Sequence, residues 1–126
     1  MDIIEFKRVV YESAKHTGYS VVQIHKPGVT PNFYAGELRI RSNNIFLLCT
    51  HDDDWALSEN FDPMVCELQF IEMPEISDAL RSHFKIALHP LEYLQSEYVK
   101  QEKHNPRDIN YWKPKTMGEV IFNWWD

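Results

Sequence analysis

The fold is decided by the stretch Phe33-Tyr-Ala-Gly-Glu-Leu-Arg-Ile-Arg-Ser-Asn-Asn-Ile-Phe-Leu-Leu-Cys-Thr50. Its first half alternates between two kinds of residue, with Tyr34, Leu38 and Ile40 on one side and Glu37, Arg39 and Arg41 on the other. Such alternation is typical of an antiparallel strand with one buried side. Ser42-Asn43-Asn44 favours a turn, and the apolar run from Ile45 to Thr50 has the length of a central strand. The stretch therefore predicts two adjacent antiparallel strands.

Similar short segments flank this pair on both sides. The segment from Tyr19 to Ile24 alternates and ends at Pro27-Gly28, which predicts a strand followed by a turn. After the pair, Trp55–Glu59 and Val65–Ile71 are further strand candidates, and the turn-forming residues Asn60, Asp62 and Pro63 separate them. We therefore expect one antiparallel sheet of about five short strands within residues 19–71.

Residues 3–17 carry the signals of a helix that packs on this sheet. Asp2 is a capping residue, Glu5 has the spacing of a capping-box partner, and Gly18 favours a helix end. The apolar residues of the segment recur at steps of three and four, which places them on one helix face. They are Ile3, Phe6, Val10 and Ala14.

The last third of the chain predicts two or three more helices. Pro74 suits a first helical turn before Ile76, Ala79 and Leu80, and the short apolar piece Phe84–Leu88 follows. A second helix is expected from Pro90 to the Asn105-Pro106 break, with a buried stripe of Leu91, Leu94, Tyr98 and Val99. Thr116 and Glu119 have capping-box spacing before a short aromatic helix, in which one of Trp124 and Trp125 is buried. The fold class is α+β, in a single globular domain over residues 1–126.

Composition excludes several classes of protein. The 126 residues have a formal net charge of −6, which argues against a nucleic-acid or anionic-membrane partner. The longest apolar run, Ile45-Phe-Leu-Leu-Cys49, is far shorter than the ~20 residues of a membrane span. The basic residues between positions 100 and 115 are interleaved with the acidic Glu102 and Asp108, which argues against a nucleic-acid-binding patch there. The beginning of the chain has no signal-peptide pattern, so we expect a cytoplasmic protein.

The negative charge is concentrated in one block of the sequence. Residues 42–80 contain nine acidic residues and no lysine or arginine. A block of this kind is either a solvated, aggregation-resistant sheet edge or an electronegative surface for a basic protein partner. The second interpretation assigns partner binding to Asp52, Asp53, Asp54, Trp55, Glu59, Asp62 and Glu67.

The sequence contains no strong catalytic or cofactor motif. Histidine spacing fits no metal-protease pattern, and Cys49 and Cys66 are expected to be buried reduced thiols. The consecutive acids Asp52–Asp54 lack a calcium-loop pattern, so neither a metal site nor a cofactor is expected. Two alternatives to a protein-binding role stay open. One is a small metal-dependent hydrolase or nuclease using residues 52–54 with His51. The other is a stand-alone interaction or ligand-binding domain with a pocket between the sheet and the terminal aromatic helix.

The chain ends in Trp112-Lys-Pro-Lys-Thr-Met-Gly-Glu-Val-Ile-Phe-Asn-Trp-Trp-Asp126. This segment resembles the closing segment of small bacterial immunity proteins, which accompany polymorphic or contact-dependent secreted toxins. The resemblance implies a cytoplasmic, non-enzymatic protein that neutralises one cognate toxin by binding it, and it implies no catalytic residues. Toxins that cut nucleic acid present basic clefts, so an acidic surface suits a partner of this kind.

Overall fold

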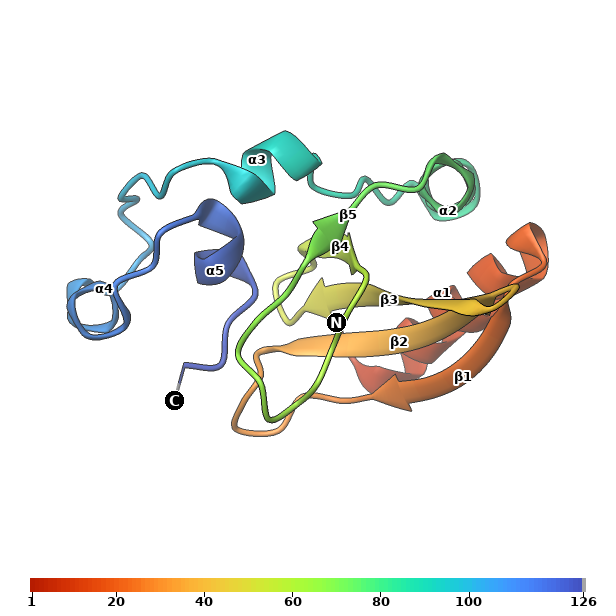
Figure 1. Ribbon diagram of the computed structural model, residues 1–126, viewed down its shortest axis with the longest axis horizontal. Helices are drawn as coiled ribbons and strands as arrows, with labels where there is room; N and C mark the ends of the chain where they lie inside the picture. The colour runs from red at the N-terminus through yellow and green to blue at the C-terminus, as the bar shows by residue number, and fades with distance from the viewer. Residues whose placement is uncertain (126) are drawn as a thin grey trace.

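The computed structural model describes residues 1–125 and shows a five-stranded antiparallel sheet with five helices around it (Figure 1). The strands follow one another in space in the order β1-β2-β3-β4-β5, so the expected α+β fold with a meandering sheet is confirmed. They are β1 Ser20–His25, β2 Phe33–Ile40, β3 Asn43–Thr50, β4 Trp55–Ser58 and β5 Phe70–Ile71. Asp126, the last residue of the segment that resembles immunity proteins, lies outside the described residues.

The quoted stretch forms the centre of the sheet. Strands β2 and β3 pair over their full length, from Phe33 opposite Thr50 to Ile40 opposite Asn43. The predicted alternation holds toward the end of β2, whereas residues 33–36 are all buried. These residues are buried because both faces of the sheet are covered there, which gives two apolar cores instead of one.

The first core lies between the sheet and the helices α1 (Ile3–Thr17) and α2 (Pro74–Phe84). Asp2 caps α1 by accepting a hydrogen bond from the Glu5 amide at 2.8 Å, and Gly18 ends the helix with a φ of 79°. Phe6 is fully buried and stacks on Tyr34 and Trp55, with ring centroids 5.2 Å and 5.9 Å away. The predicted apolar face of α1 is therefore the face that covers the sheet.

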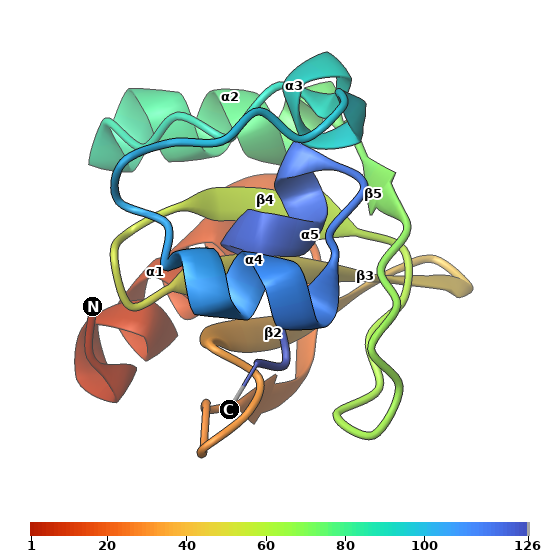
Figure 2. The same ribbon diagram turned by 90° about the vertical axis from the view of Figure 1, so that its left-hand side faces the viewer.

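The second core lies between the opposite face of the sheet and the carboxy-terminal segments. Figure 2 shows α1 behind the sheet and the helices α4 (Pro106–Trp112) and α5 (Met117–Ile121) in front of it. Thr116 and Glu119 form the predicted capping box at the start of α5. A Cβ on Gly118 would lie 2.6 Å from the Phe70 ring and 2.8 Å from the Leu94 carbonyl oxygen, so the absence of a side chain lets α5 approach β5 closely.

The prediction of one helix from Pro90 to Asn105 was wrong. Helix α3 covers only Leu91–Gln95, and Val99, expected in a buried stripe, is 66% exposed. The helix ends because the following backbone pairs with the segment before α5. The Tyr98 amide donates to the Lys115 carbonyl at 2.9 Å, and the Met117 amide donates to the Ser96 carbonyl at 3.0 Å. This pairing between residues about 20 apart cannot be read from local periodicity.

The two terminal tryptophans were expected in the last helix, but they follow it, because α5 ends at Ile121. Trp124 is buried and Trp125 is partly exposed. Trp125 lies nearly parallel to Trp112, with ring centroids 6.2 Å apart. Among residues 1–125, no helix has both the length and the apolar character needed to cross a bilayer.

A hydrogen bond between Tyr19, which directly precedes β1, and Glu75 of α2 makes the stability of the fold vary with pH in the alkaline range. The buried Tyr19 hydroxyl donates to the Glu75 carboxylate at 2.8 Å. Burial and this bond raise the pKa of Tyr19 from 10.0 to about 12. The folded protein thus retains this proton more tightly than the unfolded chain, so its stabilising contribution is complete below about pH 10 and is lost as pH rises toward 12.

We expect Tyr19→Phe to remove part of this loss of stability. Urea unfolding at several alkaline pH values should show a shallower fall in the free energy of unfolding for the variant, because phenylalanine has no proton to release. Identical pH slopes for the two proteins would contradict this assignment.

Candidate functional site

Strand β4 divides the predicted acidic surface into two groups. Asp52, Asp53 and Asp54 lie in the turn before β4, whereas Glu59, Asp62 and Glu67 follow its other end. Four residues of strand span about 13 Å, so the acids do not form one continuous cluster. Each group has its own surroundings.

The turn before β4 uses two of its acids to hold the fold together. The Asp54 carboxylate lies 2.8 Å from His89 Nε2 and accepts a hydrogen bond from the Thr50 hydroxyl at 3.2 Å. The Asp53 carboxylate lies 3.8 Å from the amino-terminal nitrogen. Asp52 is exposed and forms no ion pair with any residue from 1 to 125. This turn therefore joins the chain's beginning to the segment after α2.

Trp55 does not belong to the surface, contrary to its place in the predicted partner-binding set. Its side chain is 4% exposed and lies against Phe6 in the first core. The residue begins β4, a strand whose four residues are all buried, and it lies in the first core beneath α1. The predicted set is thus reduced to its acids.

The second group of acids lies on a long loop between β4 and β5, residues 59–69, which we call the acidic loop. Figure 2 shows this loop extending away from the sheet beyond β5. Glu59, Asp62 and Glu67 are exposed, and none forms an ion pair within the described part of the chain. Between them Met64 is 88% exposed and Val65 is 46% exposed. The loop therefore presents an apolar tip flanked by free carboxylates.

The acidic loop replaces most of a predicted strand. Residues 65–71 were expected to pair with the sheet, but only Phe70 and Ile71 do so. Cys66, expected to be buried in that strand, is exposed on the loop, whereas Cys49 is buried in β3 as predicted. Burial raises the pKa of the Cys49 thiol well above its ordinary value, so this sulfur stays protonated.

Hydrogen bonds hold the acidic loop in one shape. The Asn60 side chain donates to the Glu67 carbonyl at 3.0 Å and accepts from the Gln69 amide at 2.6 Å, closing the loop at its base. At the tip, the Asp62 carboxylate accepts from the Met64 amide at 2.8 Å. The Trp124 indole donates to the Pro63 carbonyl at 3.0 Å. The loop is therefore preorganised by its own residues and by the end of the chain.

We expect Asn60→Ala to loosen this loop without unfolding the sheet. The substitution removes the two hydrogen bonds at the loop base and a third, which Asn60 Oδ1 accepts from the Ser58 hydroxyl at 3.1 Å. Each contributes about 1 kcal/mol. Amide hydrogen exchange at Gln69 should become faster, while exchange in the central strand β3 should stay close to that of the parent protein. Unchanged exchange at Gln69 would show that the Asn60 side chain does not close the loop.

The residues of the proposed hydrolytic alternative do not form a recognisable metal centre. Among residues 1–125, no group of three histidine, cysteine or acidic side chains is arranged to hold a metal ion. The His51 ring lies edge-on to Tyr34, with centroids 5.6 Å apart. The Asp54 carboxylate is hydrogen-bonded to Thr50 and lies against His89.

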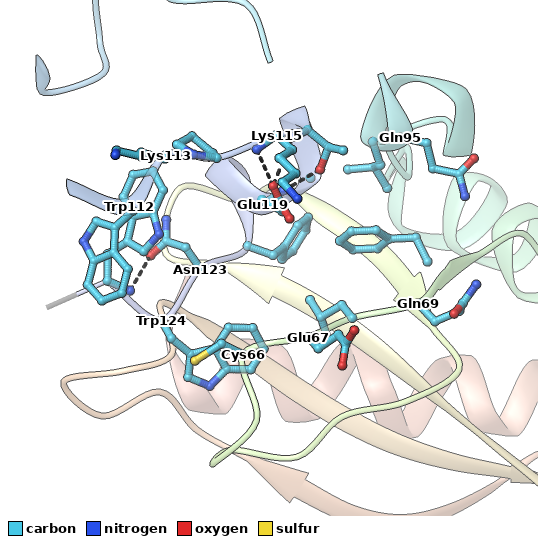
Figure 3. A pocket seen from close by; sticks show the side chains of 18 residues that line it. Cys66, Glu67, Gln69, Gln95, Trp112, Lys113, Lys115, Glu119, Asn123 and Trp124 are labelled. Atoms are coloured by element: carbon cyan, nitrogen blue, oxygen red, sulfur yellow. Dashed lines mark hydrogen bonds between the residues drawn. The ribbon is translucent and has the colours of Figure 1, made fainter. Parts of the chain in front are cut away.

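A groove of about 550 Å³ lies behind the acidic loop, between the loop's inner side and the end of the chain. Figure 3 shows Cys66, Glu67 and Gln69 along one wall and Lys115 and Glu119 on the other. The pocket considered from the sequence was to lie between the sheet and the terminal aromatic helix. The groove differs from it, because Phe70 is the one strand residue among the described residues of its lining and the acidic loop supplies the facing wall. The lining mixes aromatic, amide and charged side chains, so the groove is not purely apolar.

Several parts of this site were missed from the sequence. The exposure of Met64 and Val65 was not predicted, because the apolar residues within 65–71 were interpreted as a strand of the sheet. The residues Asn60-Phe-Asp-Pro63 favour turns and indicated where the loop begins, but not how far it extends. The support from Trp124 joins residues 61 positions apart and has no local signal.

The arrangement provides an exposed, hydrogen-bonded loop with carboxylates around apolar side chains. Such a surface can bind a protein by charge and by contact, and it needs no bound group to do so. Comparisons of the chain with family models, curated proteins and solved structures give no match.

Proposed function

We propose that this chain is a non-enzymatic binding protein of the immunity type, which neutralises a secreted toxin by covering a basic surface of that toxin. The observation that carries the proposal is the acidic loop, where Met64 and Val65 protrude between unpaired carboxylates. Protein interfaces combine an apolar centre with a polar, charged rim, and this loop has both.

The hydrogen bonding of the loop supports a binding role. A loop that is already ordered loses little conformational freedom when it meets a partner, so more of the contact energy contributes to affinity. Here the base is closed by Asn60 and the tip is supported by Trp124. Trp124 belongs to the segment that resembles immunity proteins. That segment acts in this proposal by positioning the loop.

The charge distribution supports a basic partner. Residues 42–80 contain no lysine or arginine, so no cation of this block offsets the carboxylates of the loop. An uncompensated acidic surface attracts an oppositely charged protein and increases its association rate constant by about 10- to 1,000-fold. A nuclease toxin with a basic cleft would act in the cytoplasm, where we place this protein.

The proposal is tested with the product of the neighbouring gene. We expect a large secreted protein with a variable carboxy-terminal domain to be encoded beside this chain. That domain should arrest bacterial growth when expressed alone, and co-expression of this chain should restore growth and yield a copurifying complex. A toxic domain that this chain neither binds nor neutralises would contradict the proposal, as would neighbouring genes that all encode enzymes of one metabolic reaction series.

A further inference from the structure

The groove behind the acidic loop is elongated and differs in character along its length. In Figure 3, Trp112 and Lys113 lie at one end, and Gln69 and Gln95 lie at the other. The lining also contains aromatic rings, including those of Phe70 and Phe122, whose centroids are 5.6 Å apart. The groove's volume falls in the usual range of about 300–1,000 Å³ for binding sites.

The two walls of the groove have unpaired charges of opposite sign. Lys113 and Lys115 are exposed on the wall that precedes α5, and neither forms an ion pair with a described residue. The nearby Glu119 carboxylate instead accepts hydrogen bonds from the backbone amides of Lys115 and Thr116. Glu67 lies on the opposite wall and is also unpaired.

The far end of the groove has free hydrogen-bonding capacity. The side-chain amides of Gln69 and Gln95 are exposed and form no hydrogen bond to any of residues 1–125. A carboxamide offers donors and an acceptor in one plane, which matches the N–H and C=O of a peptide unit. An extended strand directs successive side chains to opposite sides, which suits two walls of opposite charge.

We propose that this groove binds an extended peptide segment of the toxin, with an acidic side chain against Lys113 and Lys115 and a basic side chain toward Glu67. The inference rests on the proposed function, because the segment belongs to the same protein partner. The acidic loop then contacts the toxin's basic surface with its outer side, while its inner side forms one wall of the peptide site.

Peptide binding in the groove can be measured through Cys66, because this exposed thiol lines the groove whereas Cys49 is buried. Short blocked peptides with one cysteine, supplied as its mixed disulfide with 2-mercaptoethanol, and with glutamate, glutamine or lysine at each other position in turn, are equilibrated with the protein and 2-mercaptoethanol. The Cys66 thiolate exchanges with the peptide disulfide and releases 2-mercaptoethanol, so no oxidant is needed. Mass spectrometry then measures the fraction of each peptide captured as a disulfide with Cys66. We expect the best glutamate peptides to be captured about threefold more than the matching lysine peptides, and the preference to weaken with salt.

Matched variants test whether Lys113 and Lys115 cause this preference. Lys115→Glu should reverse the selection toward lysine peptides, and Lys113→Glu provides a second test at the same wall. Lys100→Glu makes the same charge change on an exposed residue outside the groove lining and should leave the selection unchanged. Cys66→Ser should abolish capture.

Equal capture of the three peptide types, or a preference that survives both Lys115→Glu and Lys113→Glu, would overturn the inference. So would equally efficient capture of a small thiol-bearing carboxylic acid supplied as the same mixed disulfide, which would indicate a site for small anions. These outcomes leave the proposed function intact if the toxin is still bound and neutralised. If the unmodified protein does not bind the toxin, the proposed function itself is contradicted.

Discussion

Replacing Phe6 with alanine is expected to lower the free energy of unfolding by about 3–5 kcal/mol. The ring is fully buried between α1 and the sheet, where it stacks on Tyr34 and Trp55, so truncation leaves a cavity at the centre of the first core. Urea denaturation followed by tryptophan fluorescence measures this loss, since Trp55 lies in the same core.

Ile4→Ala is the matched control for this prediction. Ile4 lies two residues away on the same helix but is 79% exposed, so its truncation should change stability by no more than about 0.5 kcal/mol. Equal losses for Phe6→Ala and Ile4→Ala would contradict the assignment of the buried helix face. A large loss for Phe6→Ala alone would also support the placement of Trp55 in the core.

Neutralising the acidic loop is expected to slow association with the toxin about tenfold at low ionic strength. The variant combines Glu59→Gln, Asp62→Asn and Glu67→Gln, and it removes three charges with little change in side-chain shape. The asparagine side chain introduced by Asp62→Asn keeps a carbonyl oxygen that can accept from the Met64 amide, so the turn at the loop tip should be retained. Stopped-flow measurements over a range of salt concentrations should show the rates of parent and variant converging as salt increases.

A second triple variant separates the loop from the net charge. Asp78→Asn, Glu92→Gln and Glu102→Gln remove the same number of charges from exposed acids on α2, α3 and the segment after α3. This control should associate with a rate close to that of the parent protein. If both triple variants slow association equally, the acidic loop has no special part in attracting the toxin.

Elements with local signals were predicted well. The β2–β3 pair follows from alternation and a turn, and α1 and α5 follow from capping residues that make the expected hydrogen bonds. The burial of both faces of residues 33–36 was not predicted, because it depends on segments at the end of the chain that fold back onto the sheet. The early end of α3 has the same origin, since its backbone pairs with residues near 115.

The candidate site was only partly predictable for a related reason. Charge placement along the sequence identified the acidic block, but strand β4 separates its members in space. The Asp54 carboxylate is hydrogen-bonded to His89, which is 35 residues away in the sequence, so it is less available to a partner than the carboxylate of Asp52. The groove is formed by two segments distant in sequence, and neither contains a recognisable binding motif on its own.

Amide hydrogen exchange of the protein alone and in complex with the toxin domain tests the central claim most directly. If the acidic loop binds the toxin, exchange should slow within residues 59–69, above all at the exposed Met64 and Val65. Exchange on the exposed side of α1 should be unchanged. Unchanged exchange throughout the acidic loop, with protection on another surface of a stable complex, would contradict the claim.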